Sequence, residues 1–152
     1  MPTTAPKALV KPKTLLVVAC ALIDTDGRIL MAQRPAGKDH AGRWEFPGGK
    51  VEVGETPEQA VRRELYEELN VEPCETCLQA FSFASFAYPD FHLMMPLYLC
   101  RQWDGFVRAK EGQSTKWIWP DKLLELDLVP ADVDLASELK DRLPRGKRFV
   151  TS

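Results

Sequence analysis

The 152-residue chain is long enough for one domain with a substantial core, and its 45% hydrophobic and 28% charged residues are an ordinary globular composition. The formal net charge of −2 argues against binding of a long nucleic acid, because a protein that neutralises many phosphates normally has an excess of basic residues. A single nucleotide remains compatible with this charge, because one local site can hold it.

The amino-terminal residues 1–13 are rich in Pro, Thr and Lys, and we expect a flexible tail there. The apolar run that follows, residues 15–23, superficially resembles a secretory signal behind its lysines. Only residues 15–19 precede Cys20, however, which is shorter than an apolar signal region of about 7 to 15 residues. The run also ends in a hairpin-turn signal, Asp24-Thr25-Asp26-Gly27. We therefore expect a buried first strand, no transmembrane segment and a cytoplasmic protein.

Further strands are expected at residues 28–33, 76–87, 92–102 and 115–119, from their β-branched and aromatic content and their turn-rich boundaries. Pro96 cannot donate a ladder hydrogen bond, so the strand that contains it should be bulged or at a sheet edge. No internal repeat or interdomain linker interrupts the chain, and residues 14–152 are expected to form a single domain.

Two helices are expected among these strands. The first begins at Thr56, with Pro57 at the first helical position and Gln59 completing a capping box. It runs to about residue 69, where Asn70 can take the left-handed closing conformation. The second runs from residue 132 or 133 to 143, with leucines at four-residue steps. Strands mixed with two helices predict an α+β or layered α/β domain.

Four cysteines, Cys20, Cys74, Cys77 and Cys100, are present in a chain that can build a core without covalent support. We expect them to be the reduced thiols of a cytoplasmic protein. Cys74 and Cys77 could form half of a zinc site. No second Cys-x-x-Cys pair follows and the only histidines are His40 and His92, so the ligand count disfavours zinc.

The first helix carries a cluster of acidic residues. Glu64, Glu67 and Glu68 stand at positions i, i+3 and i+4, which places three carboxylates on one helix face. Like charges at this spacing repel, and the helix dipole disfavours anions in the last turns. Converging oxygen donors are what a hard cation such as Mg²⁺ prefers. The alternative is a solvated acidic face, which is the usual meaning of a charge run.

The loop before this helix favours the metal site over the solvated acidic face. Pro47-Gly48-Gly49-Lys50 lets the backbone approach a ligand closely or adopt conformations closed to other residues, and Lys50 can pair with phosphate. Glu55 stands immediately before the helix cap. A glycine loop, a lysine and four carboxylates in so short a span indicate phosphate and metal held together.

Here the sequence resembles a known family. Gly49, five residues, Glu55, seven residues, Arg63-Glu64-Leu65, Tyr66, Glu67-Glu68, then Val71 after two residues is similar to the Nudix box, with Asn70 where glycine is usual. The resemblance covers residues 15–143 and is closest to the MutT branch, the 8-oxo-dGTP diphosphatases. It implies a layered α/β/α fold with a mixed sheet between helices.

The resemblance also implies the reaction and its residues. Glu64, Glu67 and Glu68 would bind Mg²⁺, for which Mn²⁺ can substitute, with the Gly48 carbonyl and Glu111 as further ligands. Arg63 would orient the glutamates, and Glu64 ranks before Glu111 and Glu55 as the general base. The reaction would be metal-assisted attack on the β-phosphorus of a nucleoside triphosphate, releasing pyrophosphate. No long nucleic acid, membrane or obligatory oligomer is implied, and a monomer is expected.

Base recognition leaves alternatives open. By the same resemblance the substrate pocket would be formed by Arg34, Asp39, Glu45, Phe46, Pro47, Gly48, Lys50, Phe91 and Asp132. The Asp132 carboxylate could accept hydrogen bonds from oxidised guanine or from the amino group of cytosine, and the related CTP pyrophosphohydrolases share its Pro-Ala-Asp triplet.

Simpler readings of these pocket residues stand beside the functional one. Asp132 could be a helix cap, Phe46 and Phe91 plain core, and Arg34 a surface cation. His40 and His92 are taken as structural or surface residues.

The sequence disfavours two other classes of function. A Nudix fold that recognises a base without hydrolysis typically lacks glutamates of the box, whereas all of them are present here. Serine catalysis is disfavoured because neither Ser82 nor Ser85 has a histidine in a recognisable triad arrangement.

Overall fold

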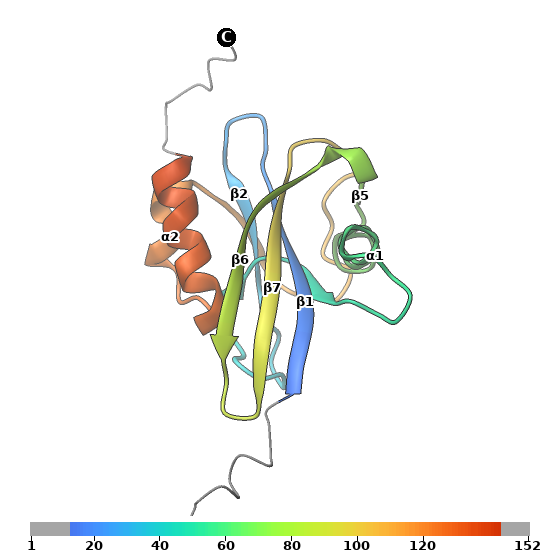
Figure 1. Cartoon of the computed structure of the whole chain (residues 1–152). Helices are drawn as coiled ribbons and strands as arrows, with labels where there is room; N and C mark the ends of the chain where they lie inside the picture. The colour runs from blue at the N-terminus through green and yellow to red at the C-terminus, as the bar shows by residue number, and fades with distance from the viewer. Residues whose placement is uncertain (1–12, 144–152) are drawn as a thin grey trace, which may run out of the picture.

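The computed structural model describes residues 13–143. The flexible tail predicted for residues 1–13 lies almost wholly outside these residues, as do the last positions of the domain predicted for residues 14–152. A long four-stranded sheet has the order β4-β1-β7-β6, and β3-β2-β9 and β5-β8 form smaller sheets. Figure 1 shows β1, β7 and β6 side by side. The strands are β1 (Lys13–Leu22), β2 (Ile29–Gln33), β3 (Trp44–Glu45), β4 (Gly48–Lys50), β5 (Glu72–Pro73), β6 (Leu78–Ala87), β7 (Phe91–Cys100), β8 (Trp103–Asp104) and β9 (Thr115–Ile118).

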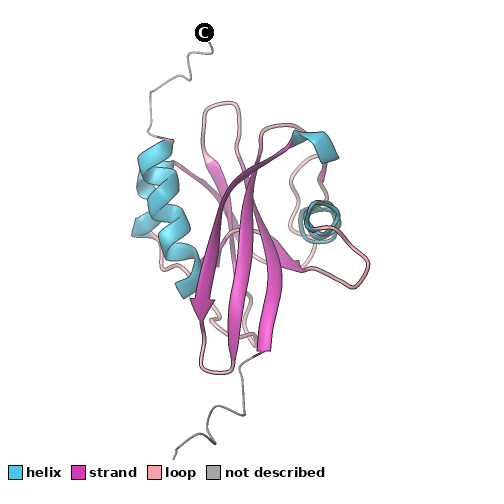
Figure 2. Ribbon diagram, in the orientation of Figure 1, coloured by secondary structure: helices cyan, strands magenta, loops and turns pink. Residues whose placement is uncertain are grey.

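Two α-helices flank the strands, α1 (Pro57–Leu69) and α2 (Val133–Arg142). They lie on opposite sides of the sheets, as Figure 2 shows. Because β1 runs parallel to β7 while its other neighbour, β4, is antiparallel, the sheet is mixed. The predicted α+β architecture is confirmed. None of the described helices combines the length and apolar composition that a membrane crossing requires.

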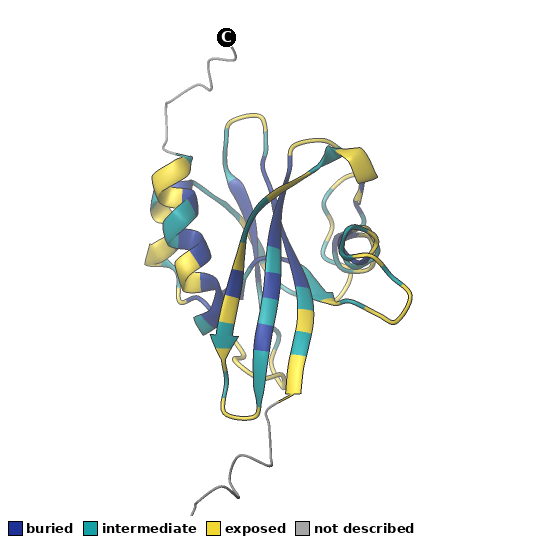
Figure 3. Cartoon of the chain, in the orientation of Figure 1, coloured by how far each residue is buried: buried dark blue, intermediate teal, exposed yellow. Residues whose placement is uncertain are grey.

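Strand β1 is apolar throughout its carboxyl half because both of its faces are covered. Val18, Cys20 and Leu22 pack in the core beneath α1, whereas Ala19 and Ala21 pack in the core shared with α2. Alternate residues of a strand point to opposite faces, so the two cores divide the run between them. Figure 3 shows this buried centre.

Helix α1 has the predicted ends. The Thr56 hydroxyl accepts a hydrogen bond from the Gln59 N–H, and the Gln59 side chain accepts one from the Thr56 N–H. Asn70 closes the helix in the left-handed conformation, with φ 64° and ψ 27°. Both signals are local, which is why the sequence alone predicts them.

Strand β7 is central, so the edge position allowed for its Pro96 is wrong. The irregularity lies instead on the neighbouring strand β6, whose register with β7 shifts between Ala80 and Ser82. On the other side, the pairs with β1 stop at Met94 and resume at Leu97. The missing N–H of Pro96 therefore falls in a gap of the ladder with β1, whereas on the other side Pro96 is paired with Phe83 of β6.

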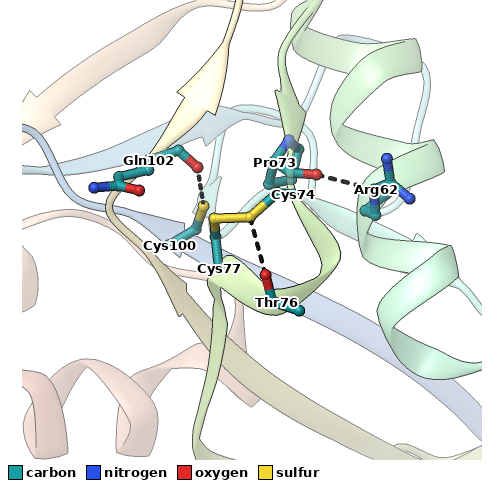
Figure 4. Close-up of a disulfide and its surroundings, with 7 residues drawn as sticks. All are labelled: Arg62, Pro73, Cys74, Thr76, Cys77, Cys100 and Gln102. Carbon is teal, nitrogen blue, oxygen red and sulfur yellow. Dashed lines mark hydrogen bonds between the residues drawn. A yellow bond between two sulfur atoms is a disulfide. The ribbon is translucent and has the colours of Figure 1, made fainter.

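The expectation of four reduced thiols is wrong for two of them, because Cys74 and Cys77 form a disulfide with a Cα–Cα separation of 5.1 Å (Figure 4). The short 3₁₀ turn η2 (Glu75–Cys77) brings the two side chains together, so β6 also begins later than predicted. Cys20 and Cys100 are free and buried. Burial raises the pKa of both thiols.

Candidate active site

Two adjoining cavities open between β1, β4, α1 and the segment before α2. The first, about 370 Å³ and here called the polar cavity, is lined by Gly48, Gly49, Glu64, Glu68, Glu111 and Gln113 among others. The second, about 520 Å³ and here called the aromatic cavity, is lined by His40, Tyr88 and Phe91 among others. Arg34, Glu45, Lys50 and Asp132 line both. The two cavities therefore form one continuous cleft.

The glycine pair is required by close packing against the protein itself. A Cβ on Gly48 would overlap the backbone of Val18 on β1, and a Cβ on Gly49 would overlap the Glu64 carboxyl group. Neither glycine has a positive φ, so an unusual conformation is not the reason for them. The pair lets α1 bring Glu64 against the sheet edge.

Arg63 ties the acidic residues together. Its Nε and Nη2 donate to the two Glu55 oxygens over 2.6 and 3.0 Å, and Nη1 donates to Glu64 Oε1 over 2.8 Å. Nη1 also reaches Glu67 Oε2 at 3.3 Å, and Nη2 the Lys50 carbonyl at 2.9 Å. One guanidinium thus holds the carboxylates of Glu55, Glu64 and Glu67.

The same contacts decide the charge state of Glu55. Hydrogen bonds from Arg63 and from the Glu52 N–H lower the pKa of Glu55, and the bonds with Glu55 and Glu64 raise the pKa of Arg63. With both of its oxygens taken, Glu55 is held as an ionised partner of Arg63.

Glu68 is a strongly perturbed acid of the cleft. Burial first, and then the nearby Glu64, Glu45 and Glu111 carboxylates, raise the pKa of Glu68 to about 9. Several carboxyl groups held together at low dielectric resist ionisation unless a cation compensates them. Oxygen donors of this kind suit a hard divalent ion, and an ion would offset the repulsion.

The structure does not gather all the predicted ligands. Glu67 lines neither cavity; its side chain is 55% exposed and contacts Arg63. Within residues 13–143 no three His, Cys, Asp or Glu side chains are arranged to hold a metal ion. Mg²⁺ usually keeps several waters and takes substrate phosphates with only one or two carboxylates, so the donors on the polar cavity fit such an ion.

Asp132 is not a helix cap. It stands at the start of α2 but makes no capping hydrogen bond there; its Oδ2 accepts from the Phe46 N–H at 2.9 Å. The residue is only 2% exposed, and burial raises its pKa to about 8 against the opposing effect of the Phe46 N–H. A buried carboxyl group that lines both cavities is suited to recognise a ligand.

Arg34 joins two other predicted pocket residues. Its Nη1 donates to Glu45 Oε1 at 3.1 Å and its Nε to the Asp39 carbonyl at 2.6 Å. Burial raises the pKa of Glu45, and Arg34 opposes that rise. The side chain of Arg34 is thus fixed at the junction of the cavities rather than free on the surface.

The predicted pocket residues Phe46, Pro47 and Phe91 differ in their placement. Phe46 is 4% exposed and belongs to the core, yet it touches the polar cavity. Phe91 lines the aromatic cavity and stacks on Tyr88, with ring centroids 5.0 Å apart. Pro47 lines neither cavity, and its carbonyl accepts from the Cys20 N–H at 2.9 Å.

Tyr88 and His40 also line the aromatic cavity, although the sequence does not predict them there. Tyr88 contacts Phe86, Phe91 and His40, and its hydroxyl accepts from the Ala131 N–H at 3.3 Å. His40 has a left-handed backbone, with φ 58°. The sequence signal for Tyr88 is an aromatic residue in the turn between β6 and β7, and the signal for His40 is a histidine shortly before the glycine loop.

The expectation that no histidine accompanies the serines needs a correction. Ser85 Oγ lies 2.7 Å from His92 Nε2. This exposed pair lines neither cavity, and among the described residues no carboxylate is hydrogen-bonded to His92. The third member of a triad is therefore missing, and Ser82 instead donates to Glu138.

A family model for the NUDIX domain matches residues 13–139. The chain belongs to the Nudix family. Its relatives include the CTP pyrophosphohydrolase of Escherichia coli K12, 38% identical over 131 residues that cover 80% of this chain and 88% of the relative. The 8-oxo-dGTP diphosphatase of the same organism is 36% identical over 128 residues, 84% of this chain and 98% of the relative.

Solved structures agree with this Nudix assignment. A MutT structure from work on Aliivibrio salmonicida and Vibrio cholerae has a TM-score of 0.73 at 33% identity, covering 86% of this chain and 99% of that one. The E. coli ORF135 protein has a TM-score of 0.76 at 34% identity, covering 90% and 96%. Both matches cover at least 86% of this chain.

Proposed function

We propose that this Nudix hydrolase is a Mg²⁺-dependent nucleoside triphosphate pyrophosphohydrolase, with 8-oxo-dGTP as the first candidate substrate. The observation that carries the proposal is the joined cleft, in which Glu64, Glu68 and Glu111 line one end and aromatic side chains line the other. A polyphosphate with its cation suits the first end, and a base suits the second. The relatives named 8-oxo-dGTP diphosphatase support the choice of nucleotide.

Glu64, Glu68, Glu111 and the Gly48 carbonyl are the groups that would hold Mg²⁺, or Mn²⁺ in its place. Glu67 would act through its contact with Arg63. Such an ion, when bound, neutralises phosphate charge and makes water easier to deprotonate. Lys50, which lines both cavities, is placed to bind a phosphate.

Glu64 remains our first choice for the residue that accepts a proton from the attacking water. It lines the polar cavity and its Oε1 is held by Arg63 at 2.8 Å. Glu55 is a poorer choice because Arg63 occupies both of its oxygens and lowers its pKa. Attack at the β-phosphorus would release a nucleoside monophosphate and pyrophosphate.

Asp132 is the proposed reader of the base. Below about pH 8 its carboxyl group is protonated in the ligand-free cleft, so it can donate one hydrogen bond and accept another. The O6 and an N–H of 8-oxoguanine match that pair, and so do N3 and the amino group of cytosine. CTP is therefore the second candidate substrate, favoured by the name of the 38% identical relative.

A nucleotide panel tests the proposal. Release of pyrophosphate is measured at fixed Mg²⁺ from 8-oxo-dGTP, dGTP, CTP, 5-methyl-dCTP and ADP-ribose. We expect the highest kcat/KM for 8-oxo-dGTP; a preference for CTP or 5-methyl-dCTP would select the second candidate. Absence of hydrolysis with tight nucleotide binding would instead indicate a base-recognition module. We further propose that the enzyme works as a cytoplasmic monomer, which gel filtration with light scattering checks for the oligomeric state.

A further inference from the structure

The loop between β8 and β9 is docked on the carboxyl-terminal turn of α1. The Lys110 N–H donates to the Glu68 carbonyl and the Arg108 N–H to the Leu69 carbonyl, each over 2.9 Å. The Gln113 side chain adds a longer bond to the Glu68 carbonyl, 3.4 Å. These carbonyls belong to the last turn of the helix, where no later N–H of the helix can satisfy them. The loop therefore caps α1.

A side-chain contact adds to this docking. The Lys110 ammonium lies 3.8 Å from the centre of the Tyr66 ring, within the range of a cation–π interaction. The last turn of α1 has no basic residue of its own, although Glu67 and Glu68 stand there against the helix dipole. Lys110 thus brings to this helix end the positive charge that its own sequence lacks.

Glu111 is the neighbour of Lys110 and lines the polar cavity. Its N–H donates to the Gln113 side chain at 3.1 Å, and Gln113 is itself bonded to α1. We propose that the contact between Tyr66 and Lys110 is a latch that positions Glu111 over the polar cavity and thereby strengthens divalent-ion binding. This inference rests on the metal-dependent function proposed above.

Charge and position make opposite predictions for Lys110. If its charge alone mattered, Lys110→Met would remove a cation near the acidic cavity and so tighten the binding of a divalent ion. If the latch matters, the same variant frees the loop and weakens binding. Tyr66→Leu leaves the net charge unchanged and should weaken binding in the same way. Loss of one exposed cation–π contact corresponds to about a two- to fivefold change.

The test is a titration of the full-length protein with Mn²⁺ alone, in which electron paramagnetic resonance measures the concentration of free Mn²⁺. We expect Tyr66→Leu and Lys110→Met each to raise the Kd for Mn²⁺ about two- to fivefold, and the double variant to be no weaker than either. In a Glu111→Gln background, Tyr66→Leu should have no further effect. Phe106→Leu is the matched control, since Phe106 is an aromatic residue of the same loop and 89% exposed.

Amide hydrogen exchange gives a readout that does not depend on the metal. Protection of the Lys110 and Arg108 amides should fall in Tyr66→Leu and stay unchanged in Phe106→Leu. Unchanged Mn²⁺ affinity in Tyr66→Leu, or tighter binding in Lys110→Met, would overturn the latch and leave the proposed function standing. If the unaltered protein bound no Mn²⁺, the proposed metal site would fail and the latch with it.

Discussion

Replacing Glu68 by Gln should stabilise the metal-free protein while removing most of its activity. Burial and the Glu64, Glu45 and Glu111 carboxylates raise the pKa of Glu68 to about 9, from an ordinary 4.5. When a carboxyl group has a higher pKa in the folded than in the unfolded chain, its contribution to stability is fully present below the unfolded-state pKa. That contribution is lost as the pH rises towards the folded-state pKa. Gln keeps the shape of the acid and has no charge to bury.

The size of this loss of stability follows from the pH interval over which Glu68 is ionised in the unfolded chain and protonated in the folded chain. At 1.36 kcal/mol per pH unit, the loss between pH 4.5 and pH 7 is at most about 3 kcal/mol, and water reaching the cavity reduces it. Glu68→Gln should therefore unfold several degrees higher than the unaltered protein at pH 7, and turnover should fall at least about a hundredfold, the scale of losing a positioned charge stabiliser.

Thermal unfolding in a chelator at pH 5, 7 and 8.5 checks the first part, and release of pyrophosphate checks the second. The difference in Tm should widen with pH. Glu67→Gln is the matched control, because Glu67 is 55% exposed and lies outside the cavities. The Tm difference between this variant and the unaltered protein should change little with pH. A Tm difference for Glu68→Gln that does not vary with pH would refute the electrostatic reasoning.

Three further outcomes are expected. Arg63→Met should lower kcat about tenfold or more with a smaller change in KM, since it frees Glu55 without touching the base cavity; an equal change in both constants would contradict this. Asp132→Ala should raise KM for the favoured base far more than for other nucleotides, and should cost about 1–3 kcal/mol of stability by stripping the buried Phe46 N–H of its acceptor; a uniform rise in KM across the nucleotide panel would argue against base reading. Reduction of the Cys74–Cys77 bridge, which closes a loop of four residues, should lower the free energy of unfolding by about 2 kcal/mol in denaturant titrations, with the double serine variant insensitive to reductant; an equal response in both proteins would place the effect elsewhere.

What could be predicted from the sequence depended on how local the cause was. Both ends of α1 follow from side chains within four residues of the cap, so the sequence predicts Thr56 and Asn70 there. The acidic face needed only the helix period. The sequence could not show which glutamates of that face line the cavity. Arg63 binds Glu67, and also Glu55 before the helix, through contacts that depend on side-chain direction.

Causes that join distant parts of the chain could not be predicted. For Asp132 the sequence leaves a pocket residue and a helix cap as alternatives, and the bond from the Phe46 N–H, 86 positions away, argues against the cap. Tyr88 enters the cleft because the turn between β6 and β7 folds back towards the segment before α2, where its hydroxyl meets the Ala131 N–H. The disulfide was missed because the size of a core says nothing about a bridge between near neighbours.

The parallel pairing of β1 with β7 has a consequence for synthesis on the ribosome. The glycine strand β4 takes its place against β1, and β1 finds its second neighbour only after the chain has reached Cys100. Contacts so distant in sequence form slowly, since a large loop must close first. A nascent chain that ends before β7 would carry the glutamate helix against β1 and β4 alone, without the β7 side chains Tyr98 and Cys100 that complete the core beneath it, and catalytic competence would arrive late in translation.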